Sequence, residues 1–124
     1  MKVSHPLTIP PTIPVRFKGP KGIKEVDALI DTGASYVILS WKDALHIGYH
    51  PKRTRAVRVA TAAGFITIPQ ITLQSVEILD LKRKNVEALV KDLPEGGIQA
   101  ILGWSFLDKF VLNINPKKKI LEIS

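Results

Sequence analysis

One carboxylate stands directly after an apolar stretch, in a setting suited to acid–base catalysis. Asp31 follows Ala28-Leu29-Ile30 and precedes Thr32-Gly33-Ala34-Ser35. The apolar residues favour a buried strand, and Gly33 allows the backbone to turn sharply and approach another group closely. Asp and Gly are also ordinary turn residues after strands, which is the simpler interpretation. Burying an unpaired charge between apolar segments costs free energy. Residues kept in a protein at such a cost are more often functional than accidental, so the position favours a catalytic aspartate.

A second stretch repeats the pattern of an apolar strand followed by glycine. Ala100-Ile101-Leu102 precedes Gly103, and a short helix is predicted over residues 104–110. With these two motifs in this order, the sequence resembles the retropepsin-like aspartic proteases, the family of the retroviral proteases. In that family an Asp-Thr-Gly-Ala loop and a later apolar-apolar-Gly loop cross beneath the active site. The resemblance extends over about residues 15–123.

The resemblance implies an all-β fold, the closed β-barrel of the acid proteases with one or two short helices, assembled as a two-fold homodimer. Residues 1–14 are expected to be a proline-rich N-terminal arm, and residues 15–124 the retropepsin-like domain. A chain of 124 residues is large enough for one core and too short for two lobes. Because the chain has a single Asp-Thr-Gly, the second carboxylate must come from another copy.

The activity implied is that of an aspartic endopeptidase. Two Asp31 carboxylates would share one proton and hold a water; one accepts its proton during attack on the scissile carbonyl and the other donates a proton. No cofactor or metal is needed. The family pattern makes Thr32 and Gly33 supports of the dyad, Gly33, Ala34 and Ser35 contacts to the substrate, and Gly103 a structural loop residue. Retroviral members usually carry aspartate where Ser35 stands, a departure where the substrate main chain is anchored.

A hairpin over residues 56–68 resembles the family's flap by its position. Its tip is made of small residues, and the resemblance assigns substrate contacts to Ala62, Ala63, Gly64 and Phe65. The retroviral flap has more glycines, and a plain β-hairpin is the alternative. Apolar candidates for pocket walls, each also interpretable as ordinary core, are Ile30, Val59, Ile66 and Ile101.

Other elements follow from local patterns. Hairpins are predicted over residues 15–27 and 111–123, a helix over 41–47 behind a capping box of Ser40 and Asp43, and strands over 71–78, 86–90 and 98–102. Residues 94–97 are predicted to be a loop. The prolines of the arm exclude a helix and a central strand. The arm could interleave between subunits, lie across the cleft, or be a disordered tail.

The chain is basic, with a formal net charge of +7 and a pI near 9.8. The positive residues form clusters at Lys52-Arg53-Arg55-Arg58, Lys82-Arg83-Lys84 and Lys117-Lys118-Lys119. The last two are predicted at turns, where solvated lysines are expected. A nucleic-acid-binding β-barrel is a rival hypothesis, but no nucleic-acid motif accompanies the clusters. The charge also favours acidic peptide substrates or partners, with a preference that weakens with salt.

The composition of the chain indicates its cellular location and the kind of source organism. The chain has no cysteine, no apolar stretch near 18 residues and no signal-peptide pattern, so we expect a cytoplasmic protein without membrane association. The lack of cysteine, the single methionine and the many Ile and Lys residues also suit a thermophilic source. His46 and His50 have a metal-ligand spacing, but Gly48 and Pro51 interrupt the helix, so no metal site is predicted. The main rival function is a non-catalytic retropepsin-fold module for dimerisation or peptide binding.

Overall fold

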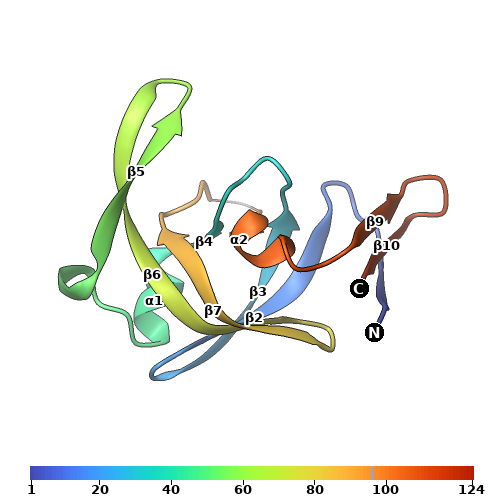
Figure 1. The fold of residues 1–124 in the computed structure, drawn as a ribbon, viewed down its shortest axis with the longest axis horizontal. Helices are drawn as coiled ribbons and strands as arrows, with labels where there is room; N and C mark the ends of the chain where they lie inside the picture. The colour runs from blue at the N-terminus through green and yellow to red at the C-terminus, as the bar shows by residue number, and fades with distance from the viewer. Residues whose placement is uncertain (96) are drawn as a thin grey trace.

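In the computed structural model, which describes residues 1–95 and 97–124, six strands close into a barrel and a seventh pairs with the part of one strand that projects from it (Figure 1). The order around the barrel is β2-β3-β8-β4-β7-β6, and pairing of Arg16, Phe17 and Lys18 with β6 closes it. The strands are β2 (Thr12–Gly19), β3 (Gly22–Ile30), β8 (Ala100–Leu102), β4 (Val37–Leu39), β7 (Leu81–Val90), β6 (Gly64–Ile78) and the extending strand β5 (Arg55–Thr61). This confirms the predicted closed β-barrel.

The two ends of the chain meet in a second antiparallel sheet. Its order is β1 (Val3–Pro6), β10 (Ile120–Ile123) and β9 (Leu112–Asn115). The Lys2 ammonium lies 2.7 Å from the Glu122 carboxylate and adds an ion pair to the β1–β10 contact. Part of the predicted arm is therefore a strand paired within the same chain, and β2 already begins at Thr12.

The barrel core follows from the alternation of side chains along the strands. Ile13, Val15 and Phe17 of β2 are fully buried, because successive residues of a strand point to opposite faces. Pro14 stands among them, although the prolines were expected to exclude a central strand. At Pro14 the strand pairs with β3 alone, and its pairing with β6 begins at Arg16. The missing N–H of Pro14 therefore removes no hydrogen bond to β6.

Several strand boundaries differ from the prediction; for example, the strand predicted over residues 98–102 begins at Ala100. The cluster Lys82-Arg83-Lys84, predicted at a turn, lies within β7, because the chain reverses earlier, at Leu79 (φ 49°) and Asp80. Lys82 and Lys84 are exposed on one side of the strand while Arg83 points to the other. The predicted strands 65–68 and 71–78 are one strand, β6, with Pro69 opposite Ala56.

The helices are short, as predicted. Helix α1 (Trp41–His46) begins after Ser40, whose hydroxyl accepts the Asp43 N–H at 3.2 Å, and Ala44 and Ile47 are buried. Helix α2 (Trp104–Leu107) ends before the predicted residue 110. A 3-10 turn, η1 (Pro51–Arg53), precedes β5. In the described part of the chain, no helix has the length and apolar character needed to cross a membrane.

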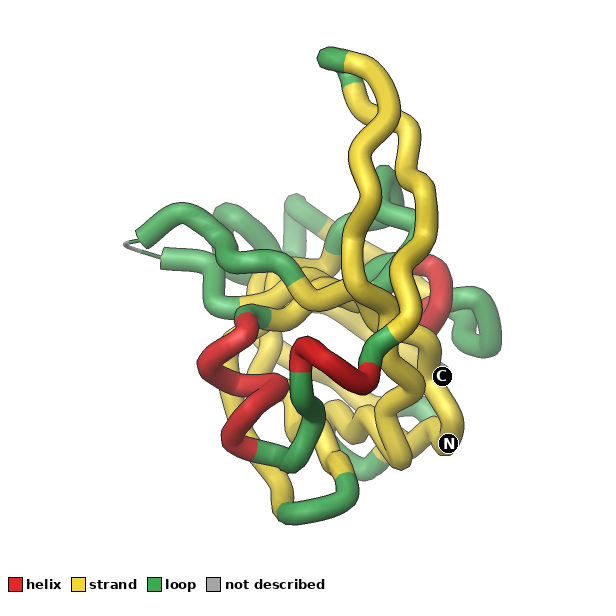
Figure 2. The backbone as a smooth tube through the Cα atoms, turned by 90° about the vertical axis from the view of Figure 1, so that its left-hand side faces the viewer, coloured by secondary structure: helices red, strands yellow, loops and turns green. Residues whose placement is uncertain are grey.

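Several loops bear on the predictions. The turn between β9 and β10 carries Lys117, Lys118 and Lys119, as predicted. Of the predicted loop 94–97, Gly96 lies outside the described residues. Seen from the side, the hairpin of β5 and the first part of β6 rises from the barrel with η1 at its root (Figure 2).

Candidate active site

Asp31 occupies the first position after β3, at the start of a tight loop. Its Oδ1 atom accepts the backbone N–H of Gly33 at 2.8 Å, and its carbonyl accepts the N–H of Ala34 at 3.1 Å. A Cβ atom at Gly33 would lie 3.2 Å from Asp31 Oδ1, so a side chain there would crowd the carboxylate. Asp31 is part-buried, while Thr32, Gly33 and Ser35 are exposed around it. The loop therefore presents one oriented carboxylate on an open surface.

Strand β8 lies between β3 and β4 and fixes the start of this loop. It runs parallel to β3, with Leu102 beside Ile30, and antiparallel to β4. The Asp31 N–H continues the ladder by donating to the Leu102 carbonyl at 3.1 Å. On the other side of β3, the Ile30 N–H donates to the Pro11 carbonyl at 2.9 Å. The two motifs singled out in the sequence thus lie side by side.

Gly103 is required by the close approach of the loop that follows Asp31. A Cβ atom at this position would collide with the carbonyl oxygen of Tyr36 and lie 2.6 Å from that of Ala34. Directly after it, the Trp104 N–H donates to Ala34 and the Ser105 N–H donates to Ser35, each at 2.9 Å. The start of α2 therefore holds Ala34 and Ser35 through their own backbone carbonyls.

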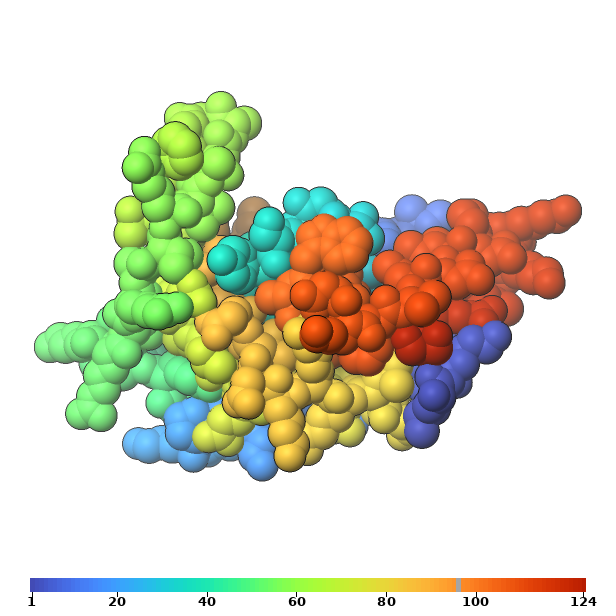
Figure 3. Space-filling view, viewed as in Figure 1, coloured from blue at the N-terminus to red at the C-terminus, as the bar shows by residue number. Residues whose placement is uncertain are grey.

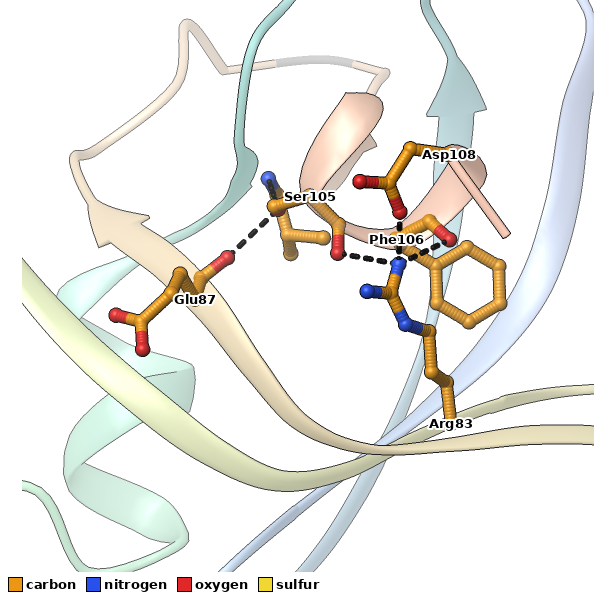
Figure 4. A network of polar contacts seen from close by, with 6 residues as sticks. Arg83, Glu87, Ser105, Phe106 and Asp108 are labelled. Atoms are coloured by element: carbon orange, nitrogen blue, oxygen red, sulfur yellow. Dashed lines mark hydrogen bonds and ion pairs between the residues drawn. The ribbon is translucent and has the colours of Figure 1, made fainter. Parts of the chain in front are cut away.

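Sequence reasoning missed the polar network that anchors α2 (Figure 4). The Ser105 hydroxyl accepts the Val37 N–H at 2.8 Å and donates to the Glu87 carbonyl at 2.7 Å. Arg83 Nη1 donates to the carbonyls of Ser105 and Phe106, each at 2.8 Å, and pairs with the Asp108 carboxylate. The network joins α2 to β4 and β7, so it positions the loop that carries Asp31.

The predicted flap is a hairpin that stands clear of the barrel. Its turn is at Ala62 and Ala63, where the Thr61 hydroxyl donates to the Gly64 carbonyl at 2.7 Å, and Gly64 has φ +117°. In the space-filling view the hairpin is separated from the loop between β3 and β4 (Figure 3). The Arg58 guanidinium lies 4.0 Å from the ring centroid of Phe65.

Cross-strand pairing gives the hairpin two different faces. Val59 pairs with Ile66, and Val57 with Ile68, so these four side chains share one face. Phe65 pairs with Ala60 on the opposite face. The apolar face could have been found in the sequence from the alternation of residues 57 and 59 with 66 and 68.

The four apolar pocket candidates differ in burial. Ile30 is 5% exposed and belongs to the core, and Ile101 is part-buried in β8. Ile66 is 38% exposed, and Val59, which faces it across the hairpin, is part-exposed. The two flap residues are therefore accessible to a ligand, whereas Ile30 is not.

The described residues bring no three His, Cys, Asp or Glu side chains together in the way a metal ion would require. A cavity of about 1090 Å³ lies away from Asp31, at the root of the flap. Tyr49 lines it, and its hydroxyl donates to the Thr72 carbonyl at 2.7 Å. Burial raises the pKa of Tyr49 above its usual value of 10.0.

Comparison with known proteins places the chain in a family. Residues 13–106 match the model of the aspartyl protease family. An uncharacterized protein in the cobV 5' region of Sinorhizobium sp. is 37% identical over 86 residues, which are 68% of this chain. The chain spans only 36% of that relative's length.

A crystal structure of a retropepsin-like aspartic protease from Rickettsia conorii is similar in fold. It matches with a TM-score of 0.71 at 23% identity, covering 99% of this chain and 90% of the other. The chain therefore belongs to the aspartyl protease family and has the retropepsin-like fold.

Proposed function

We propose that the protein is an aspartic endopeptidase that acts as a homodimer, with one Asp31 from each protomer. The observation that carries the proposal is the oriented Asp31 carboxylate, held by Gly33 in a loop that β8 and α2 fix from behind. One carboxylate accepts a proton from water as the water oxygen bonds to the scissile carbonyl carbon. The other donates a proton to the substrate, and the C–N bond then breaks to give a carboxylic acid and an amine.

The exposure of the Asp31 loop supports an arrangement with two protomers. Thr32 and Gly33 are exposed in the single chain. A protomer supplies one such carboxylate, and the mechanism needs a second at close range, so a two-fold axis beside Asp31 completes the dyad. Thr32 would then support the dyad across the axis.

An apolar edge on the terminal sheet supports the dimer independently. Val111, directly before β9, is 68% exposed, and Ile114, within β9, is 41% exposed. Strand β9 lies at the edge of its sheet, with β10 on its other side. Exposed apolar residues on an unpaired edge favour association, so we place the subunit contact there.

The flap would close over an extended substrate that lies above Ala34 and Ser35. Val57, Val59 and Ile66 form the accessible part of its apolar face and suit contact with substrate side chains, whereas Ile68 is only 6% exposed. Phe65 lies on the other face against Arg58 and would stiffen the hairpin. Ala62, Ala63 and Gly64 at the turn would contact the substrate backbone as the flap closes.

The test is cleavage of a diverse peptide library, read by mass spectrometry over about pH 3 to about pH 8. We expect the wild type to cut with a bell-shaped pH dependence, since the dyad must hold a single proton. Asp31→Asn should abolish all cuts. The matched control is Asp27→Asn, because Asp27 is an exposed residue of β3, the strand that leads into Asp31, and this variant should cut like the wild type.

Circular dichroism and sedimentation of each variant show whether fold and assembly are unchanged. Cuts that survive in Asp31→Asn would point to a contaminating protease. If the wild type cuts nothing while it is folded and dimeric, the peptidase proposal fails and a peptide-binding module becomes the better interpretation.

A further inference from the structure

A cationic cavity opens at the root of the flap, away from Asp31. Its volume is about 1090 Å³, and it lies between the β2–β3 turn, the loop after α1, η1 and the strands β6 and β7. Figure 2 faces this side of the molecule, with α1 and η1 in front of the strands. Its lining includes His50 and four cations: Lys21, Lys52, Arg53 and Arg55.

The described lining of this cavity carries more positive than negative charge. The cavity cations are exposed, and within the described residues the ion pairs are made by Lys2, Arg16 and Arg83. The one carboxylate in the lining, Glu87, accepts the Thr72 hydroxyl at 2.9 Å and the Gln70 side-chain amide. With four cations against the single carboxylate of Glu87, the described lining retains an excess of positive charge that attracts anions.

The walls of the cavity are held in place by backbone contacts. The Lys21 N–H donates to the Ile47 carbonyl at 3.0 Å. Gly48 has φ +103°, and a Cβ atom there would lie 2.9 Å from Lys21 Cβ, so the turn and the loop pack without a side chain between them. Tyr49 bonds to Thr72 on the cavity floor. The backbone that carries Lys21 is therefore fixed against the loop after α1 before a ligand binds.

We propose that this cavity binds an acidic segment of the polypeptide substrate, outside the cleft that holds the scissile bond. The proposal rests on the proposed peptidase function and adds a substrate class to it. Lys21 belongs to the barrel and Arg55 begins the flap strand β5, so an acidic segment that contacts both would tether the substrate beside the flap.

The surroundings favour a polypeptide over a nucleic acid. Strand β5, which starts at Arg55, is the terminal strand of its sheet, and its free edge can pair with an extended peptide backbone. Single-stranded nucleic acids are held by stacking of bases on aromatic side chains. In the described lining the aromatic rings are those of Tyr49, which is partly buried and bonded through its hydroxyl, and of His50, whose Nδ1 accepts the Lys52 N–H at 3.2 Å.

The binding test uses the Asp31→Asn protein, so that no peptide is cut. A labelled oligoglutamate peptide is titrated by fluorescence anisotropy beside an oligoglutamine peptide of the same length. We expect oligoglutamate to bind at least about tenfold more tightly at about 50 mM salt, and the preference to fall to about twofold at about 500 mM salt, since these charges are exposed to screening.

Two triple variants separate the cavity from general charge. Lys52→Gln/Arg53→Gln/Arg55→Gln removes three of the four cavity cations, and we expect the affinity for oligoglutamate to fall at least about tenfold. Lys18→Gln/Lys82→Gln/Lys84→Gln removes the same charge from exposed positions of β2 and β7 that do not line the cavity, and should change it less than about twofold. Equal weakening by both variants would overturn the proposal.

The kinetic arm uses one cleavable core sequence with an acidic or a neutral tail. At low salt the acidic tail should raise kcat/KM about tenfold through KM, because the tether acts in the ground state and the transition state alike. The cavity variant should remove this difference and still cut the neutral substrate.

The remaining outcomes distinguish the two proposals. Cleavage of neutral peptides without binding of oligoglutamate would overturn the cavity proposal alone. Binding at the cavity without any cleavage by the wild type would overturn the peptidase proposal and support the binding site. Displacement of the peptide by an oligothymidylate of equal charge at lower concentration would identify a nucleic-acid site and overturn the peptide assignment.

Discussion

The backbone N–H of Asp31 donates to the carbonyl oxygen of Leu102 at 3.1 Å, across a parallel pair of strands. The next residue, Gly103, packs against the backbone of the loop that follows Asp31. The candidate catalytic loop is thus held at its start by β8 and further on by α2. Stability of the fold and positioning of the carboxylate depend on the same few contacts, which makes both measurable in the same variants.

Gly103→Ala should destabilise the protein and abolish activity. The new Cβ would collide with backbone oxygens of Ala34 and Tyr36, which cannot rotate away as a side chain would. We expect the free energy of unfolding to fall by about 1–3 kcal/mol. Chemical denaturation measures it. Gly97→Ala is the control, since nothing lies within 4 Å of a Cβ there, and it should change stability by less than about 0.5 kcal/mol.

Ser105→Ala should weaken the attachment of α2. It leaves the Val37 N–H and the Glu87 carbonyl without their partner, and an unsatisfied group in a part-buried site costs about 1–3 kcal/mol. Denaturant melts compare it with Ser4→Ala, an exposed serine of β1. If both variants are equally stable, the Ser105 bonds contribute nothing to the fold.

Ile114→Glu should dissociate the proposed homodimer. It places a charge on the apolar edge strand β9, where the side chain is 41% exposed in the single chain. We expect at least about a tenfold rise in the dimer dissociation constant, measured by sedimentation velocity, with a parallel loss of activity. Ile23→Glu changes an isoleucine of β3 that is 55% exposed, and should leave assembly unchanged. A wild type that is monomeric at every concentration would contradict the dimer.

Tyr49 should make the fold sensitive to alkaline pH. Burial raises the pKa of its hydroxyl in the folded chain above the usual 10.0, so the unfolded chain loses this proton first. The stabilising contribution is fully present below about pH 10 and is lost as the pH rises through the raised pKa. Urea denaturation from about pH 8 to about pH 11 should show a steeper loss for the wild type than for Tyr49→Phe. Equal slopes would contradict the assignment.

The sequence predicted the parts of the site that rest on local chemistry. A carboxylate after an apolar strand, a glycine after a second one and the Ser40 cap each depend on a few neighbouring residues. The hairpin signals were of the same kind. They located the turn of the β5–β6 hairpin at Ala62 and Ala63, because the small residues and the glycine of this turn are neighbours in the sequence.

The supports of the site could not be predicted in the same way. The bond between Val37 and Ser105 joins positions 68 residues apart, and nothing near either one marks it. Arg83 stands in a basic cluster that matches the composition of a solvated turn, yet its side chain contacts α2. Arg83 points inward because side chains alternate between the two faces of β7. The sequence does not reveal this alternation, because both neighbours of Arg83 are also basic.

The insertion of β8 between β3 and β4 has a consequence for the order in which the protein is made. During synthesis the segment with Asp31 leaves the ribosome well before residues 100–105, and it meets neither the Leu102 carbonyl nor the Ser105 hydroxyl until they emerge. A growing chain therefore carries its carboxylate in an unsupported loop. Under the proposed function, a chain can cut peptides only after α2 has been synthesised. Nascent chains nearby are therefore not cleaved by an incomplete protease.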